Sequence, residues 1–140
     1  MKKNFFNIEN NFYKLAPFSR LEKFIIQLEL FKKSIKVRGD IIEFGVYKGN
    51  SLIRLISLNK IYNKTKKKVF AFDVFNKFPI GKNEKDKKQR KNFIKNAGEN
   101  SIKVKELSNI LKKKKFQNFS LVKGDVLETI PKFLITYEKL

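Results

Sequence analysis

Three carboxylates of this chain stand at or near the ends of short apolar segments, a placement that suits nucleotide binding. Glu43 lies in the run IIEF, Asp73 ends the run VFAFD, and Asp125 follows the run FSLVKG. The carboxyl ends of the strands in an open parallel sheet line one crevice, so the three acids are expected to converge there. A carboxylate that ends the second strand can accept two hydrogen bonds from the vicinal hydroxyls of a ribose. Asp73 is therefore the strongest single candidate for a binding residue.

A glycine-rich turn follows the first apolar run. Gly45 and Gly49 bracket the segment GVYKG, and Asn50 or Ser51 can cap the helix expected after it. Glycine permits positive φ and lets a ligand lie against the main chain, while the amides of a helix N-terminus favour an anionic group. The spacing is ExGxxxG, and the dinucleotide fingerprint GxGxxG is absent. A purely structural turn stays open as an alternative, although the acid at Asp73 weakens it.

Two interpretations of Asp125 stay open. The residue could reach the expected nucleotide crevice, or it could only cap the helix predicted over 126–137, a role that aspartate often fills. Pro131 lies inside that helical pattern, which predicts either a proline in the first turn or a kink.

The elements that must position these residues follow from the apolar periodicity. Together with the glycine turn, the first two strands and the helix between them match one right-handed βαβ crossover. The charged segment 74–100 predicts a long mobile loop with a short helix near 89–95, and Ser101 is expected to cap a helix over 101–115. Strands are predicted at 41–44, 69–73 and 119–123.

One domain over residues 1–140 is expected, with a helical lead-in over 1–38 and a βαβαβα binding part over 39–140. The fold class is α/β and Rossmann-like, with three parallel strands in the order 3-2-1 and flanking helices. Apolar residues of the lead-in repeat at helical spacing, which favours core packing: Leu21, Phe24, Ile25, Leu28 and Phe31.

The composition is strongly basic, with 33 Lys and Arg against 13 Asp and Glu and a formal net charge of +20. This balance makes a basic nucleic-acid-binding or interaction module the alternative function. Almost all of the positive charge is lysine, whereas arginine is the residue expected for bidentate phosphate or base contacts. The excess charge therefore favours a solvated lysine surface, and nucleic acid is the less favoured partner.

Other classes of protein are excluded by what the sequence lacks. It contains neither cysteine nor histidine, so disulfides, Cys/His zinc sites and histidine-based catalysis are excluded. No apolar run reaches membrane-spanning length, and the polar N-terminus lacks the apolar stretch of a signal peptide. A reducing cytoplasm is the expected location.

Taken together, the motifs resemble the class I S-adenosylmethionine-dependent methyltransferases, and within them the macrocin O-methyltransferase family of sugar-modifying enzymes. The resemblance implies a Rossmann-like fold, S-adenosylmethionine as cofactor, and methyl transfer to a hydroxyl on a sugar or glycosylated small molecule. It rests on GDIIEFGVYKGNSLIR, FAFDVFNKFP and LVKGDVLETIPKFL, preceded by the helical lead-in FYKLAPFSRLEKFIIQLELFKK.

The resemblance also implies roles for individual residues around the cofactor. Phe75 and Pro79 would belong to a loop near the active site. Glu43, Gly45 and Gly49 would shape the pocket for the methionine part of the cofactor, and Ser51 would help to hold the methionine carboxylate. Asp73 would bind the ribose hydroxyls, and Asp125 would lie near the adenine amino group.

The sequence departs from the family pattern after residue 140. In the family a fourth strand follows, with an acidic motif that holds Mg²⁺ and supplies the base, so no metal ligand or catalytic residue is assigned here. The resemblance therefore implies an N-terminal fragment that retains the donor-binding half. Strand 41–44 would then be a free edge, and instability, aggregation, a homo-oligomer or a complementing chain is expected.

Overall fold

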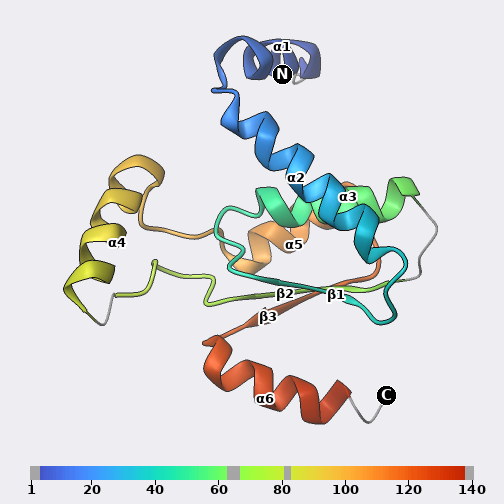
Figure 1. The fold of residues 1–140 in the computed structure, drawn as a ribbon, viewed down its shortest axis with the longest axis vertical. Coiled ribbons are helices and arrows are strands. Elements are labelled where there is room, and N and C mark those ends of the chain that lie inside the picture. Colours follow the sequence, from blue (N-terminus) through green and yellow to red (C-terminus); the bar gives the residue numbers. More distant parts are fainter. Residues whose placement is uncertain (1–3, 63–66, 81–82, 138–140) are drawn as a thin grey trace. The chain divides into compact units, whose positions relative to one another are not determined.

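The computed structural model describes residues 4–62, 67–80 and 83–137 (Figure 1). The chain divides into two compact units, Met1–Val37 and Arg38–Leu140. Among the described residues, no helix combines the length and the apolar character needed to span a membrane.

The first unit consists of α1 (Phe5–Leu15) and α2 (Ser19–Ser34). The side chain of Asn4 caps α1 by accepting a hydrogen bond from the Asn7 amide at 3.2 Å. The predicted core packing is found at Phe31, which is buried. It is not found at Leu21, Phe24 or Ile25, which are 37%, 39% and 57% exposed. Two helices offer too little surface to enclose an apolar face on all sides.

The second unit contains a three-stranded parallel sheet with the order β1-β2-β3: β1 (Ile41–Phe44), β2 (Val69–Asp73) and β3 (Phe119–Lys123). The predicted strands, their order and the α/β fold class are confirmed. The central strand is the most deeply buried, with Val69, Ala71 and Phe72 fully enclosed. This burial agrees with its uninterrupted apolar run, which is typical of a parallel strand covered on both faces.

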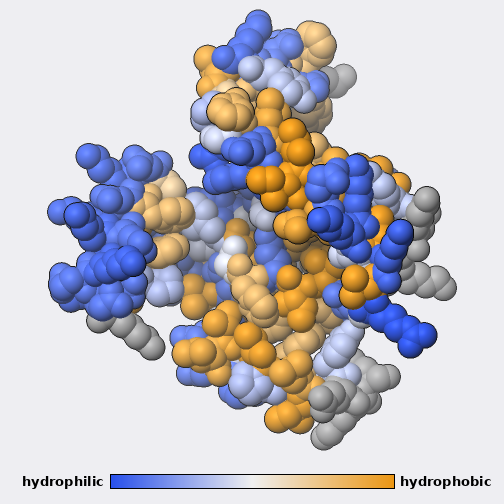
Figure 2. Space-filling view, viewed as in Figure 1, coloured by the Kyte–Doolittle hydropathy of each residue, from blue (hydrophilic) through white to orange (hydrophobic). Residues whose placement is uncertain are grey.

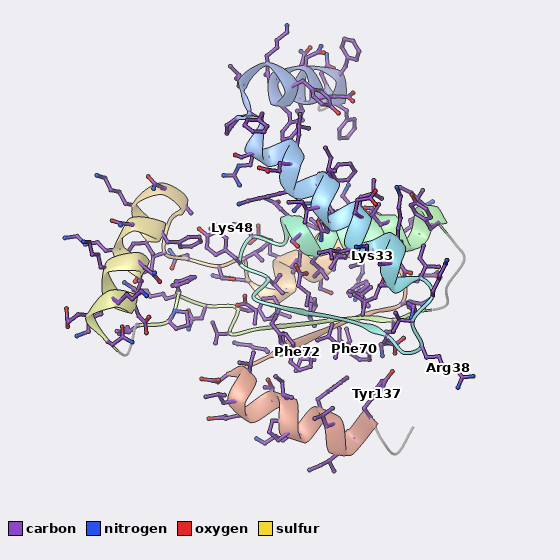
Figure 3. The ribbon with its side chains drawn as sticks, viewed as in Figure 1. Lys33, Arg38, Lys48, Phe70, Phe72 and Tyr137 are labelled. Atoms are coloured by element: carbon purple, nitrogen blue, oxygen red, sulfur yellow. The ribbon has the colours of Figure 1, made fainter. Side chains whose placement is uncertain are left out.

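Helices cover both faces of this sheet: α3 (Asn50–Tyr62) and α5 (Val104–Lys113) lie on one face and α6 (Val126–Tyr137) on the other, as Figure 1 shows. On the α6 face, the ring centroid of Phe133 lies 4.7 Å from the ring centroid of Phe70 and 5.2 Å from that of Phe72. Figure 3 shows Phe70 and Phe72 directed toward α6 and Tyr137. The core on the opposite face is formed by Val46, Leu52, Ile56, Val69, Ala71, Phe75, Leu107 and Leu111.

The segment expected to be a long loop contains a complete helix, α4 (Glu84–Ala97). The side chain of Asn83 caps this helix through the Asp86 amide at 2.8 Å, and Gly98, with φ 87°, ends it. None of its described residues is buried. The helix predicted near 89–95 lies within α4, which is longer than expected. It depends on good helix formers and caps, and it lacks the apolar periodicity that marks a packed helix.

Two predictions about helix ends also need correction. The helix α5 begins at Val104 and has no side-chain cap, whereas the hydroxyl of Ser101 donates to the Tyr47 carbonyl oxygen at 2.8 Å. Pro131 lies within α6 beyond its first turn, so the predicted first-turn proline is wrong and the alternative, a kink, stays a prediction. Ser101 fails as a cap because a long-range partner competes for its hydroxyl.

Candidate functional site

The carboxylate of Asp73 connects the end of β2 to the turn that follows β1. Its Oδ2 atom accepts hydrogen bonds from the amides of Val46 at 2.7 Å and Tyr47 at 2.9 Å. Its Oδ1 atom accepts from the Phe75 amide at 2.6 Å. Hydrogen bonds to an ionised acceptor are stronger than neutral ones, so Asp73 holds this turn in place. A carboxylate has about four acceptor positions, which leaves capacity for a ligand hydroxyl.

The two glycines of the turn have different surroundings. Both have positive φ, 81° at Gly45 and 83° at Gly49, as the sequence predicted for a tight turn. A Cβ added at Gly49 would lie 2.8 Å from the Leu107 Cδ1 atom, whereas one added at Gly45 would meet nothing within 4 Å. Gly49 therefore lets α5 pack closely, and Gly45 leaves the main chain open to a ligand.

Glu43 is a partly buried carboxylate on β1, beside the first turn of α3. Its Oε2 atom is inaccessible to solvent and has no hydrogen-bond partner among the described residues. Desolvation raises the pKa of Glu43 above its ordinary value, against the opposing effects of a hydrogen bond from the Ser51 hydroxyl and the nearby charge of Arg54. The negative charge of Asp73 raises this pKa further, so the two acids lie close enough to interact. Buried acceptors without a partner are rare in folded proteins, so this one keeps Glu43 a candidate for a functional contact.

We expect the Glu43→Gln variant to gain stability over wild type as the pH rises. The pKa of Glu43 lies above its ordinary 4.5 in the folded chain, so the folded state binds this proton more tightly than the unfolded state does. Wild type therefore loses stability as the pH rises from about 4.5 through the raised pKa, and glutamine removes that loss. Urea unfolding at acidic and neutral pH measures the difference, with exposed Glu106→Gln as the control. An equal effect at both pH values would contradict the prediction.

Asp125 stands at the start of α6 and is exposed. Its carboxylate accepts from the Leu127 amide at 2.9 Å, and its carbonyl oxygen accepts from the Thr129 amide at 2.9 Å. These contacts are those of a helix cap. The preceding Gly124 donates its amide to the Asp73 carbonyl oxygen at 3.0 Å, which places Asp125 one residue beyond that contact. Its predicted contact with an adenine stays a prediction.

Tyr47 is a residue of the site that the sequence did not point out. It has φ 50°, and its hydroxyl lies within hydrogen-bonding distance of the carbonyl oxygens of Ala97 and, at 2.8 Å, of Gly98, which share its single proton. Its own carbonyl oxygen accepts from the Ser101 hydroxyl and the Ile102 amide, both at 2.8 Å. A bulky residue between two glycines of a turn was the only signal for this role.

Residues 17–134 match the family described as macrocin-O-methyltransferase (TylF). The chain belongs to this family. The resemblance seen in the motifs is thereby confirmed, and the matched range contains every predicted site residue of the macrocin-O-methyltransferase pattern. No curated protein matches the chain.

Solved methyltransferase structures share the fold of this macrocin-O-methyltransferase family member. The calicheamicin methyltransferase CalS11 matches with a TM-score of 0.73 and 21% identity, over 99% of this chain and 58% of that one. The O-methyltransferase NovP matches with a TM-score of 0.65 and 17% identity, over 78% of this chain and 47% of that one. The apo structure of CalS11, described as TDP-rhamnose 3'-O-methyltransferase, matches with a TM-score of 0.60 and 20% identity, over 99% and 55%. The chain thus spans about half the length of these structures.

The remaining predicted residues of the macrocin-O-methyltransferase pattern, Phe75 and Pro79, follow Asp73 along the chain. Phe75 is buried in the core with φ 49°, so its ring packs inside the protein. Pro79 is exposed, and its carbonyl oxygen accepts from Arg90 Nε of α4 at 3.0 Å. Within the described ranges, no three acidic side chains come together in a way that could hold a metal ion.

Proposed function

We propose that the turn between β1 and α3 binds S-adenosylmethionine, and that the chain provides the donor-binding part of an O-methyltransferase. The observation that carries this proposal is the family match over residues 17–134. The turn held by Asp73 and left open at Gly45 fits that membership. Because the chain spans about half of the solved relatives, the complete activity is part of the proposal.

The residues of the turn would bind and orient the donor. The sulfonium of S-adenosylmethionine supplies an electrophilic methyl group, and the protein contributes alignment with the acceptor hydroxyl. Glu43 would accept an N–H of the methionine part, which requires its solvent-inaccessible Oε2 atom to turn toward the donor. The donor would contact the main chain at Gly45, and Gly49 would keep the turn tight. Ser51 would hold the methionine carboxylate. Asp73 would bind the ribose hydroxyls, and Asp125 would lie near the adenine amino group.

We further propose a sugar hydroxyl, free or on a glycosylated small molecule, as the acceptor. One solved structure similar to this chain is described as a TDP-rhamnose 3'-O-methyltransferase. The family that the chain matches is described as macrocin-O-methyltransferase. No described residue of this chain is assigned as the base that removes the hydroxyl proton, and Mg²⁺ is assigned no ligand here.

Isothermal titration with S-adenosylhomocysteine tests the donor site in the full chain. We expect saturable binding of one ligand per chain, competed by S-adenosylmethionine. Adenosine alone should bind more weakly because it lacks the methionine part that Glu43 would contact. The absence of any binding by S-adenosylhomocysteine would overturn the proposal, and salt-sensitive binding of an oligonucleotide in its place would favour the basic interaction module.

We also propose that a further strand covers β1 in the assembled enzyme, from a second copy or a complementing chain. Within the described sheet, β1 pairs only with β2. Ile42 and Phe44 are 44% and 55% exposed, on the face that carries α6. Figure 2 shows apolar side chains gathered over α6. The exposed apolar residues of this helix are Leu127, Leu134 and Ile135. An apolar edge of this kind is a site for pairing with another chain.

The Phe44→Lys variant should self-associate less than wild type. Lysine on an edge strand opposes pairing because its charge would have to be buried at the contact. Sedimentation velocity over a range of concentrations measures the effect, and at least about a tenfold shift in the concentration of half-association is expected. Ile61→Lys adds the same charge at an exposed residue of α3, away from the edge. Equal behaviour of the two variants would contradict the prediction.

A further inference from the structure

The helix α4 is attached to the rest of its unit through a few contacts. None of its described residues is buried, and Figure 1 shows it apart from the sheet. Arg90 Nη2 forms an ion pair with Glu99 at 2.5 Å and donates to the Phe78 carbonyl oxygen at 3.2 Å. The ring of Phe93 lies 4.8 Å from that of Phe78 and 5.1 Å from that of Tyr47. An element with so little buried surface opens at a low free-energy cost.

Tyr47 joins this weakly held helix to the turn held by Asp73. Its amide donates to Asp73, while the carbonyl oxygens of Ala97 and Gly98, at the C-terminal end of α4, share the single proton of its hydroxyl. Lys48, labelled at this turn in Figure 3, adds a hydrogen bond from its Nζ atom to the Asn100 carbonyl oxygen. Movement of either the turn or α4 therefore breaks contacts of the same residue.

The backbone of Tyr47 indicates that its side chain is what the position requires. A φ of 50° is the left-handed conformation that glycine adopts without strain and that bulky residues rarely adopt. Glycine occurs at both ends of the same turn, so a glycine here would continue the local pattern. The tyrosine supplies what glycine cannot, namely the hydroxyl contacts and the ring packed on Phe93.

We propose that Tyr47 is a positioning residue that couples the donor turn to α4, so that donor binding and the docking of α4 stabilise each other. The inference rests on the proposed donor site. A ligand that holds the main chain of the turn also holds the Tyr47 hydroxyl at the end of α4. Coupling between two such sites is reciprocal, so a more loosely held α4 weakens donor binding and a bound donor stabilises α4.

Hydrogen exchange of the full chain tests the coupling from both directions. S-adenosylhomocysteine should slow amide exchange across residues 84–97 in wild type. The Tyr47→Phe variant keeps the ring and the main chain but loses the hydroxyl, so exchange in α4 should be at least about threefold faster. Its dissociation constant for S-adenosylhomocysteine should rise about three- to tenfold. Tyr13→Phe removes an equivalent hydroxyl from α1 and should change neither quantity.

The Phe93→Ala variant gives a second test from the α4 side. It alters no residue assigned to the donor, yet it should weaken the binding of S-adenosylhomocysteine by a similar factor. The far-ultraviolet circular dichroism spectrum of the chain should be retained. Unchanged affinity in both variants, or exchange in α4 that does not respond to the ligand, would overturn the coupling. If wild type binds no S-adenosylhomocysteine, the proposed function and the coupling to the donor both fail, while faster exchange in Tyr47→Phe would still establish the contact with α4.

Discussion

Asp73→Asn should destabilise the second unit by about 2–4 kcal/mol and weaken the binding of S-adenosylhomocysteine roughly 100-fold. The carboxylate accepts from the amides of Val46, Tyr47 and Phe75, and the asparagine amide has only one acceptor oxygen. Its NH₂ group would face a backbone donor. The turn would lose its fixed position and the donor would lose a carboxylate. Urea unfolding and isothermal titration measure the two effects separately.

Asp86→Asn is a matched control for this change. It removes the same charge from an exposed position in the first turn of α4, where the loss should cost only a few tenths of a kcal/mol. Donor affinity within about twofold of wild type in Asp73→Asn would show that the carboxylate only organises the turn. In that case the ribose assignment would fail, although the structural role of Asp73 would stand.

Gly49→Ala and Gly45→Ala should separate packing from ligand contact within one turn. Both positions have φ near 80°, so each variant bears a similar backbone strain, about 1–2 kcal/mol. At Gly49 the new methyl group would also lie 2.8 Å from the Leu107 side chain, and such overpacking adds about 1–3 kcal/mol. Gly49→Ala should therefore be the less stable variant by thermal or urea unfolding.

Gly45→Ala should bind the donor more weakly than Gly49→Ala, although Gly49→Ala is the less stable variant. The affinities are compared after correction for the folded fraction. A methyl group at Gly45 would project into open space, where the donor is proposed to lie, and should weaken S-adenosylhomocysteine about tenfold. Titration at a temperature where both variants are fully folded makes the comparison. Equal affinities would mean that the donor does not lie against Gly45.

The glycine turn and the acid at the end of β2 could be predicted because their signals are local. The runs IIEF, VFAFD and FSLVK mark the strands, and parallel pairing through βαβ units allows few strand orders. The helix α4 could not be predicted in the same way. Its core contacts are almost absent, so no apolar period indicated its length.

The use of each side chain depended on distant partners. Asp73 was predicted from its place on a strand, yet its partners Val46 and Tyr47 lie 27 and 26 residues away. Ser51 was expected to reach a ligand carboxylate, and its hydroxyl is bonded to Glu43. The apolar residues of α2 were expected in a core, although Phe24 and Ile25 are exposed. Periodicity shows which face of a helix is apolar, but not whether another element covers it.

The amino-acid sequence alone was enough to determine the three strands, the turn after the first and the family, because each depends on residues close together along the chain. Only the tertiary structure decided that Gly49 packs against Leu107 whereas Gly45 faces open space, and how Tyr47 contacts α4. Those contacts join segments about 50 residues apart, and their geometry exists only after the sheet and its helices have packed.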